Sequence, residues 1–241
     1  NGGNSDLKPD WLWIKNRTAS YAHFVVDSNR NISFAQNSSN APYLETNSDA
    51  AENNNQNWMQ SVNTDGFTTG ISEHHNCNNG SAYVAWQWKA NGGTTSTNTA
   101  GDINSTVQVN SDAGFSIVTY NPSNTTTRNI GHGLGVKPDC ILIRNRTRVE
   151  NWRMWFNVIG QGALTLDGTA AYTVNSSLVN SATTSVFNIG GDFSVNGNYP
   201  YVAYCFAEKQ GYSKFGKYFG NGNADGPFVY TGFKPAFLMM K

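Results

Sequence analysis

Near its beginning the chain carries Lys8-Pro9-Asp10-Trp11-Leu12-Trp13-Ile14-Lys15-Asn16-Arg17-Thr18. The same pattern returns as Lys137-Pro138-Asp139-Cys140-Ile141-Leu142-Ile143-Arg144-Asn145-Arg146-Thr147, and a shorter version follows as Lys234-Pro235-Ala236-Phe237-Leu238-Met239-Met240-Lys241. In each copy a Lys-Pro pair leads into a short apolar run. An internal repeat of this length is the signature of an architecture built from related units. We therefore expect modules of one fold that recur along the chain.

Further matches follow the repeated block in the same order in both units. They pair Phe24–Asp27 with Met154–Asn157, Ala41–Asn47 with Thr169–Asn175, Gly66–Gly70 with Val186–Gly190, and Tyr83–Ala90 with Tyr201–Glu208. Agreement at several places in one order is hard to obtain by chance. It predicts that each unit contains the same series of structural elements.

The repeats divide the chain into parts. We predict a first β-sandwich module over residues 1–90, a low-complexity linker over 91–112, a second module over 113–208 and the start of a third over 209–241. Unit one has no counterpart of Gly114–Val136, so we expect its opening strands to lie upstream or to be absent. The linker is almost uncharged, although Val107 and Val109 are able to add an edge strand to a neighbouring sheet.

The apolar runs favour strands. Trp11–Ile14 and Ile141–Ile143 are short and bounded by polar turn residues, which is typical of strands buried on both faces. Phe115–Tyr120 and Tyr83–Lys89 lean toward period-two alternation, which predicts half-buried antiparallel strands. No segment holds a helical apolar period with suitable caps. The sequence thus predicts an all-β protein of tandem antiparallel β-sandwich modules, of the jelly-roll or concanavalin-like kind.

The composition describes a folded protein with a neutral surface. Charged residues are 13 % of the chain, about half of the ~25 % usual in globular proteins, and Asn, Ser, Thr and Gly replace them. The 16 basic and 16 acidic side chains cancel, so nothing favours nucleic acid or an anionic membrane as a partner. Aromatic residues reach 13 %, too many for a disordered chain. No apolar run approaches the roughly 18 residues of a transmembrane helix, so we expect no membrane insertion.

Several segments resemble a known family. They are Gly114-Phe115-Ser116-Ile117-Val118-Thr119-Tyr120, Gly131-His132-Gly133-Leu134-Gly135-Val136-Lys137-Pro138-Asp139, residues 220–235 and the ending Tyr83-Val84-Ala85-Trp86-Gln87-Trp88-Lys89-Ala90. Together they resemble a module of virion and tail-fibre-like proteins of tailed bacteriophages, especially marine ones. In that family the module occurs in tandem and often accompanies concanavalin-like, laminin-G-like domains. The resemblance covers most of the chain and implies a virion protein, but the family has no assigned catalytic residues to carry over.

Two places are candidates for ligand binding. Trp58 lies in an Asn-rich stretch outside the repeated strands, where its indole is suited to stack on a sugar. His74, His75 and Asn76 have no counterparts in unit two, so we expect a loop that is specific to unit one and open to ligand binding. Adjacent His side chains on a strand point to opposite faces, so we predict no metal site there. The tryptophans of the repeated strands are expected to pack in the core.

The other reactive side chains are interpreted as structural. His132 lies between glycines, where we expect its imidazole to satisfy a turn carbonyl rather than act as a base. Cys140 and Cys205 occupy strand positions. A glycosidase needs two carboxyl groups that face one cleft, and the scarce Glu residues offer no such spaced pair. We therefore predict that the protein is not an enzyme and needs neither a metal nor a cofactor.

These observations lead to a structural protein on the virion surface, outside the cell. We expect a fibre, a tail-associated part or a capsid decoration that contacts host glycans, other virion proteins and its own copies, with repeated weak sites acting by multivalency. The alternatives are a secreted or surface adhesin of a bacterium with no virion role, a catalytic depolymerase, and a spacer without a ligand. Copurification with a capsid protein, turnover of a polysaccharide and a blank glycan array separate these alternatives.

Overall fold

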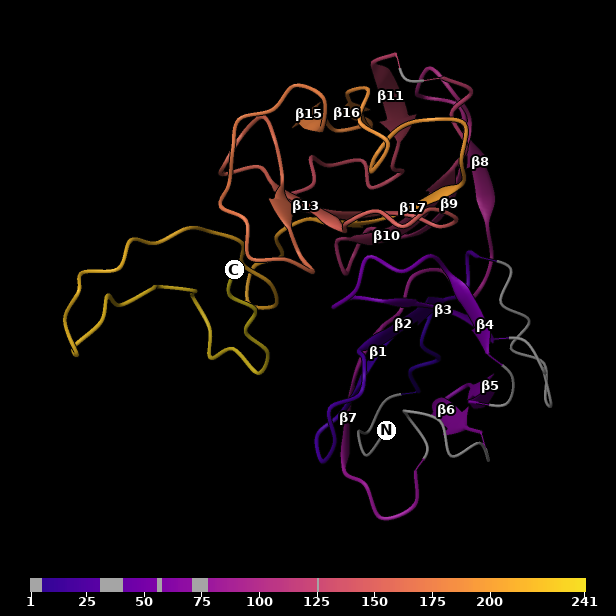
Figure 1. Ribbon diagram of the computed structural model, residues 1–241, viewed down its shortest axis with the longest axis vertical. Helices are drawn as coiled ribbons and strands as arrows, with labels where there is room; N and C mark the ends of the chain where they lie inside the picture. The colour runs from indigo at the N-terminus through magenta and orange to yellow at the C-terminus, as the bar shows by residue number, and fades with distance from the viewer. Residues whose placement is uncertain (1–5, 31–40, 56–57, 71–77, 125) are drawn as a thin grey trace.

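The computed structural model describes residues 6–30, 41–55, 58–70, 78–124 and 126–241. These residues form strands and loops, and none of them forms a helix, as the sequence predicts (Figure 1). The named strands pair only in antiparallel fashion. Over the same ranges there is no helix with the length and apolarity needed to cross a membrane. The protein is therefore all-β, built of antiparallel sheets that pack as a β-sandwich.

Unit one supplies two sheets. The first central sheet has the strand order β4-β3-β2-β1-β7, and the first outer sheet consists of β5 and β6. The strands are β1 (Trp11–Asn16), β2 (Phe24–Asp27), β3 (Ala41–Glu45), β4 (Asn53–Asn55), β5 (Met59–Asn63), β6 (Gly66–Thr69) and β7 (Tyr83–Trp88).

Unit two supplies the larger pair of sheets. The second central sheet has the order β14-β13-β12-β17-β10-β9-β8, and the second outer sheet has the order β11-β16-β15. The strands are β8 (Ser96–Asn98), β9 (Ser105–Asn110), β10 (Phe115–Tyr120), β11 (Arg128–Gly131), β12 (Cys140–Asn145), β13 (Arg153–Phe156), β14 (Leu164–Thr165), β15 (Val179–Ala182), β16 (Val186–Ile189) and β17 (Tyr201–Phe206).

The four sheets stack as layers, with the two central sheets face to face in the middle (Figure 1). Three apolar clusters fill the gaps between the layers. Leu12, Ile14 and Phe24 belong to the cluster under the first outer sheet, and Ile141 and Ile143 belong to the one under the second outer sheet. The middle cluster draws side chains from both units, among them Trp11, Val25, Leu44, Phe115, Ile117, Cys140, Leu142, Trp152, Met154 and Tyr204. The two units therefore share one core.

This stacking explains why the repeated strands are apolar on both faces. In β1 the consecutive residues Trp11 and Leu12 point to opposite faces and enter different clusters, one toward unit two and one toward the first outer sheet. All six residues of β12 are buried, for the same reason. The prediction of doubly buried strands is confirmed. The prediction that Phe115–Tyr120 is half-buried is wrong, because the central sheet that contains β10 is covered on both sides.

The polar residues of the repeated block hold the strand ends in place. Asp10 Oδ2 accepts the backbone N–H groups of Ala90 at 2.7 Å and Gly92 at 2.8 Å, just beyond the end of β7. In unit two, Asp139 Oδ2 accepts the N–H of Glu208 at 2.9 Å, beyond the end of β17. The repeated Asp thus satisfies backbone donors where the strand ladder ends, which is the requirement placed on buried backbone groups.

The repeated Asn does the same at the other end. Asn16 Oδ1 accepts the N–H groups of Thr18 and Ala19, and its Nδ2 donates to the Tyr83 hydroxyl at 3.2 Å. Asn145 Oδ1 likewise accepts the N–H groups of Thr147 and Arg148, and its Nδ2 donates to the Tyr201 hydroxyl at 3.1 Å. These matched contacts make β7 the structural counterpart of β17. They also show that the Asp and Asn residues of the repeated block have a structural role.

The strand register corrects one part of the sequence alignment. Trp11 faces Asp27 across β1 and β2, whereas Cys140 faces Phe156 across β12 and β13. Because Trp11 and Cys140 hold the same place in the repeat, Asp27 corresponds to Phe156 and not to Asn157. The alignment of Phe24–Asp27 with Met154–Asn157 is therefore wrong by one residue. A carboxylate occupies in unit one the position that a phenyl ring occupies in unit two.

Two predicted boundaries also change. Residues 91–112 are not a linker, because β8 and β9 lie within them and extend the second central sheet beyond β10. The strand allowed by the sequence at Val107 and Val109 is β9, although β8 and not β9 forms the edge. Val107 is buried there, since β9 packs under the second outer sheet. Residues 209–241 contain no strand, and most of their side chains are exposed. The two repeat units thus meet through their sheets, without a spacer between them.

Candidate functional site

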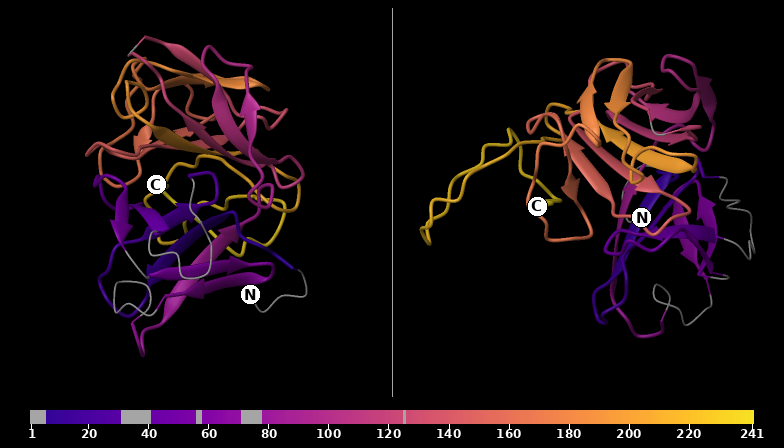
Figure 2. Two further views of the ribbon diagram at one scale, coloured as in Figure 1. Left: turned by 90° about the vertical axis from the view of Figure 1, so that its right-hand side faces the viewer. Right: turned by 45° about the horizontal axis from the view of Figure 1, so that its top comes forward.

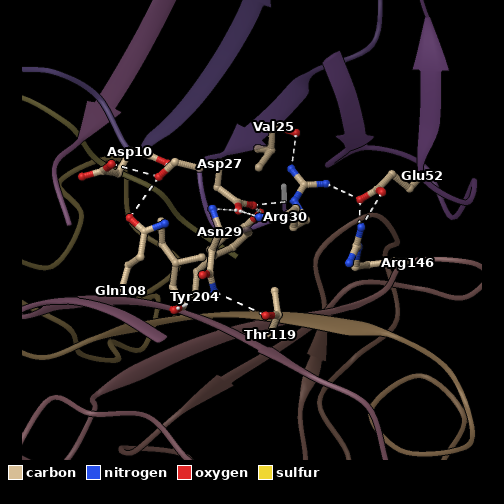
Figure 3. A network of polar contacts seen from close by, with 12 residues as sticks. Asp10, Val25, Asp27, Asn29, Arg30, Glu52, Gln108, Thr119, Arg146 and Tyr204 are labelled. Atoms are coloured by element: carbon tan, nitrogen blue, oxygen red, sulfur yellow. Dashed lines mark hydrogen bonds and ion pairs between the residues drawn. The ribbon is translucent and has the colours of Figure 1, made fainter. Parts of the chain in front are cut away.

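The turn after β2 carries a polar junction into unit two (Figure 3). Asp27 Oδ1 accepts the N–H groups of Asn29 and Arg30, both at 3.0 Å, which closes a tight turn. Its other oxygen, Oδ2, accepts a hydrogen bond of 2.6 Å from the Tyr204 hydroxyl of β17. Burial raises the pKa of Tyr204 well above its ordinary value, so its hydroxyl keeps the proton that it donates. One carboxylate therefore links a turn of unit one to a strand of unit two.

Arg30 is a fully buried cation at the centre of the junction. Its Nε lies 2.5 Å from Asp27 Oδ2, its Nη1 lies 2.7 Å from Glu52 Oε2, and its Nη2 donates to the Val25 carbonyl at 3.0 Å. Burial alone would lower the pKa of Arg30, but the charge of Asp27 and the neighbouring Tyr204 and Glu52 outweigh it and raise the pKa. Because the guanidinium group is planar and carries N–H donors on several sides, it contacts all of these partners at once.

Glu52 joins Arg30 to unit two. Its Oε1 lies 2.8 Å from Arg146 Nη2, and its Oε2 accepts a hydrogen bond of 3.0 Å from Arg146 Nε. This is the bidentate geometry in which arginine binds carboxylates most strongly. Burial by itself raises the pKa of Glu52, but the charges and hydrogen bonds of Arg30 and Arg146 outweigh it and hold the pKa below its ordinary value. The carboxylate therefore stays ionised between two cations.

This arrangement predicts acid sensitivity. Because the folded pKa of Glu52 lies below that of the unfolded chain, its contribution to stability is full above the unfolded value of ~4.3 and declines as the pH falls through the folded value. We expect urea unfolding to show a smaller free energy at about pH 3.5 than at about pH 7. The Glu52→Gln variant should lose less over the same interval, because it has no carboxylate to protonate there. Equal losses in both proteins would contradict the assignment.

More hydrogen bonds cross between the units around the junction. Asn29 Nδ2 donates to the Thr106 carbonyl at 2.9 Å, and Ser28 Oγ donates to Gln108 Oε1 at 3.0 Å. On the far side, Trp152 Nε1 donates to the Glu45 carbonyl at 2.7 Å, and Arg144 Nη2 donates to the carbonyls of residues 49 and 50. These groups are used to hold the two central sheets together. The junction therefore joins unit one to unit two through several hydrogen bonds and ion pairs.

The half-buried rings of Trp13, Trp86 and Trp88 form a separate feature, the aromatic shelf. The ring centroids of Trp13 and Trp86 are 5.2 Å apart, and the two residues face each other on the neighbouring strands β1 and β7. Trp88 continues the row toward the buried ring of Trp11, 4.8 Å away. Because residues two apart on a strand share a face, these rings gather on the side of the first central sheet that faces the second. The shelf lies at the margin of the shared core.

The third copy of the repeat already places an aromatic ring on this shelf. The Phe237 centroid lies 5.3 Å from that of Trp86, 6.1 Å from Trp88 and 6.4 Å from Trp13. The His23 ring flanks Trp13 at 6.3 Å, and burial, with a smaller effect of the nearby Lys15, lowers its pKa. Phe237 keeps 37 % of its surface exposed. The shelf is therefore covered in part by a flat apolar ring of the same chain.

The sequence-predicted ligand residues fall elsewhere. Trp58 is only 1 % exposed and packs edge-on against Phe24 at 5.5 Å and Tyr43 at 5.8 Å. The interpretation of Trp58 as an open stacking platform is therefore wrong, because its indole fills the core between the first central and first outer sheets. His74, His75 and Asn76 lie outside the described residues. Trp58 therefore does not lie on the shelf.

The remaining titratable groups have structural contacts. His132 is fully buried, with Nε2 3.2 Å from the Thr183 carbonyl and Nδ1 accepting the N–H of Leu134, which confirms its place in a turn. Burial lowers the pKa of His132, so its imidazole is neutral at pH 7. Cys140 and Cys205 are buried strand residues, and burial raises the pKa of Cys205 to about 12. In the part of the chain that the structure describes, no three His, Cys, Asp or Glu side chains gather as a metal site.

Sequence reasoning missed the shelf because it treats each tryptophan by itself. Trp13 and Trp86 lie in apolar runs that are typical of strands in the core. Trp11, which belongs to the same run as Trp13, is indeed buried in the core. Only the antiparallel register, which sets Trp13 opposite Trp86 and Trp11 opposite Trp88, brings the rings into one row. The signal available in the sequence was the Trp-x-Trp spacing, which occurs in both strands.

Comparison with known proteins gives one family. No curated protein and no solved structure matches the chain. The family described as a domain of unknown function, DUF7483, matches residues 3–241, so a single domain model spans both repeat units and the segment after them. Since this match covers nearly the whole sequence, the chain belongs to the DUF7483 family.

Proposed function

We propose that the chain is a non-enzymatic structural protein of a bacteriophage particle, located on the virion surface. In this role it forms a rigid β-sandwich body and contacts neutral host glycans through the aromatic shelf. The virion setting rests on the family resemblance of the repeated segments. The glycan contact rests on one observation, the half-buried row of Trp13, Trp86 and Trp88 at the margin of the first central sheet.

The geometry of the shelf supports contact with a sugar. Tryptophan rings offer large flat apolar surfaces at little cost in conformational entropy, and they pack well against other flat groups. Phe237 occupies the row at ring distances of 5.3 to 6.4 Å, which shows the size of group that fits. The net charge of zero supports recognition of uncharged sugars, since no field of either sign covers the surface as a whole.

The described side chains also support a role without catalysis. A general acid or base needs a titratable group within reach of a substrate. Here the carboxylates of Asp10, Asp27, Glu52 and Asp139 all accept hydrogen bonds from the protein's own backbone or side chains. His132 is buried and neutral. These groups stabilise the fold and leave the shelf as the best candidate for a contact with another molecule.

A glycan array followed by calorimetry tests the shelf. We expect the protein to bind neutral oligosaccharides weakly, and Trp86→Ala to reduce the affinity at least ~10-fold, in line with the loss of one stacked ring at about 1–3 kcal/mol. Phe237→Ala should bind as well as the parent chain or better, because it uncovers the shelf.

Tyr212→Ala is the matched control, since Tyr212 is an aromatic side chain that is 56 % exposed and is not among the rings in contact with Trp13, Trp86 or Trp88 in the described part of the chain. It should leave binding unchanged. An array without any hit, or equal affinities of the parent chain and Trp86→Ala, would rule out the glycan contact. Mass spectrometry of purified phage particles tests the virion role, which requires the chain to copurify with a capsid protein.

A further inference from the structure

The outward face of the second outer sheet carries polar side chains of one kind. The core-facing residues of β11, β16 and β15 are Ile130, Phe187, Ile189, Val179 and Ala182. Because side chains alternate along a strand, Asn129 and Asn188 point the other way, out of the core. This sheet is the outermost layer of unit two, as Figures 1 and 2 show. The two asparagines are therefore half-buried residues at the surface of the protein.

Hydrogen bonds join these asparagines to two further amides in a row that runs across the strands. Gln161 Nε2 donates to Asn180 Oδ1 at 2.9 Å, and Asn180 Nδ2 donates to Asn188 Oδ1 at 2.9 Å. Asn188 Nδ2 then donates to Asn129 Oδ1 at 2.8 Å. We call these four residues the amide row. Each inner amide uses one N–H and one oxygen lone pair in the row, so a second N–H and a second lone pair are left for another molecule.

A β-bulge places Asn180 in the row. The register of β15 against β16 shifts between Val179 and Ser181, so Asn180 is the extra residue. Bulges of this kind re-aim a side chain and are over-represented next to functional sites. Unit one has a bulge at the same place in β5, and its extra residue is Gln60, which is also an amide. The bulge and its amide side chain therefore occur in both units.

Stability of the sheet does not explain the choice of asparagine. Asparagine is depleted in strands, yet it occurs at facing or adjacent places in three neighbouring strands. The counterpart of Asn188 in unit one is Thr68, which likewise follows a core phenylalanine in the strand. A β-branched residue therefore fits the same place in this fold. The amides of unit two are better explained by a contact with another molecule.

We propose that the amide row binds an extended, uncharged polysaccharide chain that lies across the strands. A sugar hydroxyl both donates and accepts, which matches an amide that offers an N–H and a lone pair side by side. Neighbouring strands lie about 4.8 Å apart, and this spacing is close to the length of one sugar unit in an extended chain. Successive sugar units therefore meet successive amides, and weak single contacts act together along the chain.

The lack of charge in the row favours an uncharged partner. Arg128 is the one charged residue of β11, β15 and β16, and alternation puts it on the face opposite to Asn129. Its Nη2 donates to Asn124 Oδ1 at 3.1 Å. The inference rests on the proposed function for the class of partner, a neutral glycan. It concerns a different surface, because the aromatic shelf belongs to the first central sheet.

NMR titration with cellohexaose, an extended and uncharged oligosaccharide, tests the row. All chains in this experiment carry Trp86→Ala, so that the shelf does not contribute. We expect the side-chain amide signals of Asn180 and Asn188 to shift. Asn188→Val should lower the affinity about 5-fold, in line with the loss of one net hydrogen bond. Because valine favours strands, the thermal midpoint should not fall.

Two controls accompany the titration. Asn198→Ala removes an exposed asparagine between β16 and β17 and should leave the affinity unchanged. Maltohexaose offers the same sugar units in a curved chain and should bind more weakly than cellohexaose. The proposal is overturned if cellohexaose does not bind, if Asn188→Val and Asn198→Ala bind equally, or if maltohexaose binds as well. The shelf is judged separately, by the effect of Trp86→Ala on the parent chain.

Discussion

The Arg30→Ala variant is expected to lose about 3–5 kcal/mol of unfolding free energy, the usual cost of removing one partner of a buried ion pair. The loss arises because Asp27 remains buried, with 0 % of its side chain exposed and no cation beside it. Glu52 also loses one of its two arginines. Urea unfolding monitored by tryptophan fluorescence measures the change, and the remaining cooperativity shows whether the variant still folds.

Two further variants separate the buried charge from other effects of the substitution. Arg148→Ala removes an arginine near the surface that pairs with Glu150 at 3.3 Å and also contacts Tyr199 and Phe193, and it should cost clearly less than Arg30→Ala. Arg30→Met combined with Asp27→Asn removes both charges and should recover part of the loss, since an apolar or neutral replacement of a whole buried pair is often tolerated. If Arg30→Ala is no more damaging than Arg148→Ala, the junction does not lock the units together.

The second large effect is expected from Trp11→Ala. Trp11 is 2 % exposed and lies in the middle cluster, with ring contacts to Trp88 at 4.8 Å, Tyr204 at 5.4 Å and Phe115 at 6.3 Å. Replacing a buried tryptophan by alanine removes its apolar surface and leaves a cavity, which costs about 3–5 kcal/mol. Chemical unfolding at equilibrium measures the cost. Because the cavity borders both units, we expect one cooperative transition at a lower urea concentration.

Trp58→Ala provides the matched comparison. Its indole is equally buried, at 1 % exposure, but its ring neighbours Phe24 and Tyr43 belong to unit one alone. It should destabilise the protein to a similar extent while disturbing a different gap between sheets. A Trp11→Ala protein that unfolds like the parent chain would show that the middle cluster contributes little.

The sequence predicts the layered arrangement of the sheets only in part. The doubly apolar runs at Trp11–Ile14 and Ile141–Ile143 predict strands that are covered on both faces, and the structure confirms them. The sequence does not reveal what covers the second face, because apolar periodicity describes burial and carries no information about the partner. The partner is the sister unit, and the contact depends on residues far apart in the chain, such as Asp27 and Tyr204.

The errors have similar causes. The polar, Gly- and Thr-rich composition of residues 91–112 predicts a linker, but the hydrogen bonds that β9 makes with β10 outweigh the weak strand propensity of these residues. The Asn-rich surroundings of Trp58 suggested an open site, although burial of its large apolar ring is the stronger effect. The aromatic shelf could not be predicted, because it exists only in the antiparallel register of β1 and β7.

The two repeat units form one body through the shared core between their central sheets. Hydrogen exchange of the Trp11→Ala protein, compared with the parent chain and with Trp58→Ala, measures whether this core couples the two units. We predict that Trp11→Ala lowers the protection of amides in β1 and β7 and, to a similar degree, of amides in β10 and β17 across the interface. Loss of protection confined to unit one, with β10 and β17 as protected as in the parent chain, would show that the two units do not share one core.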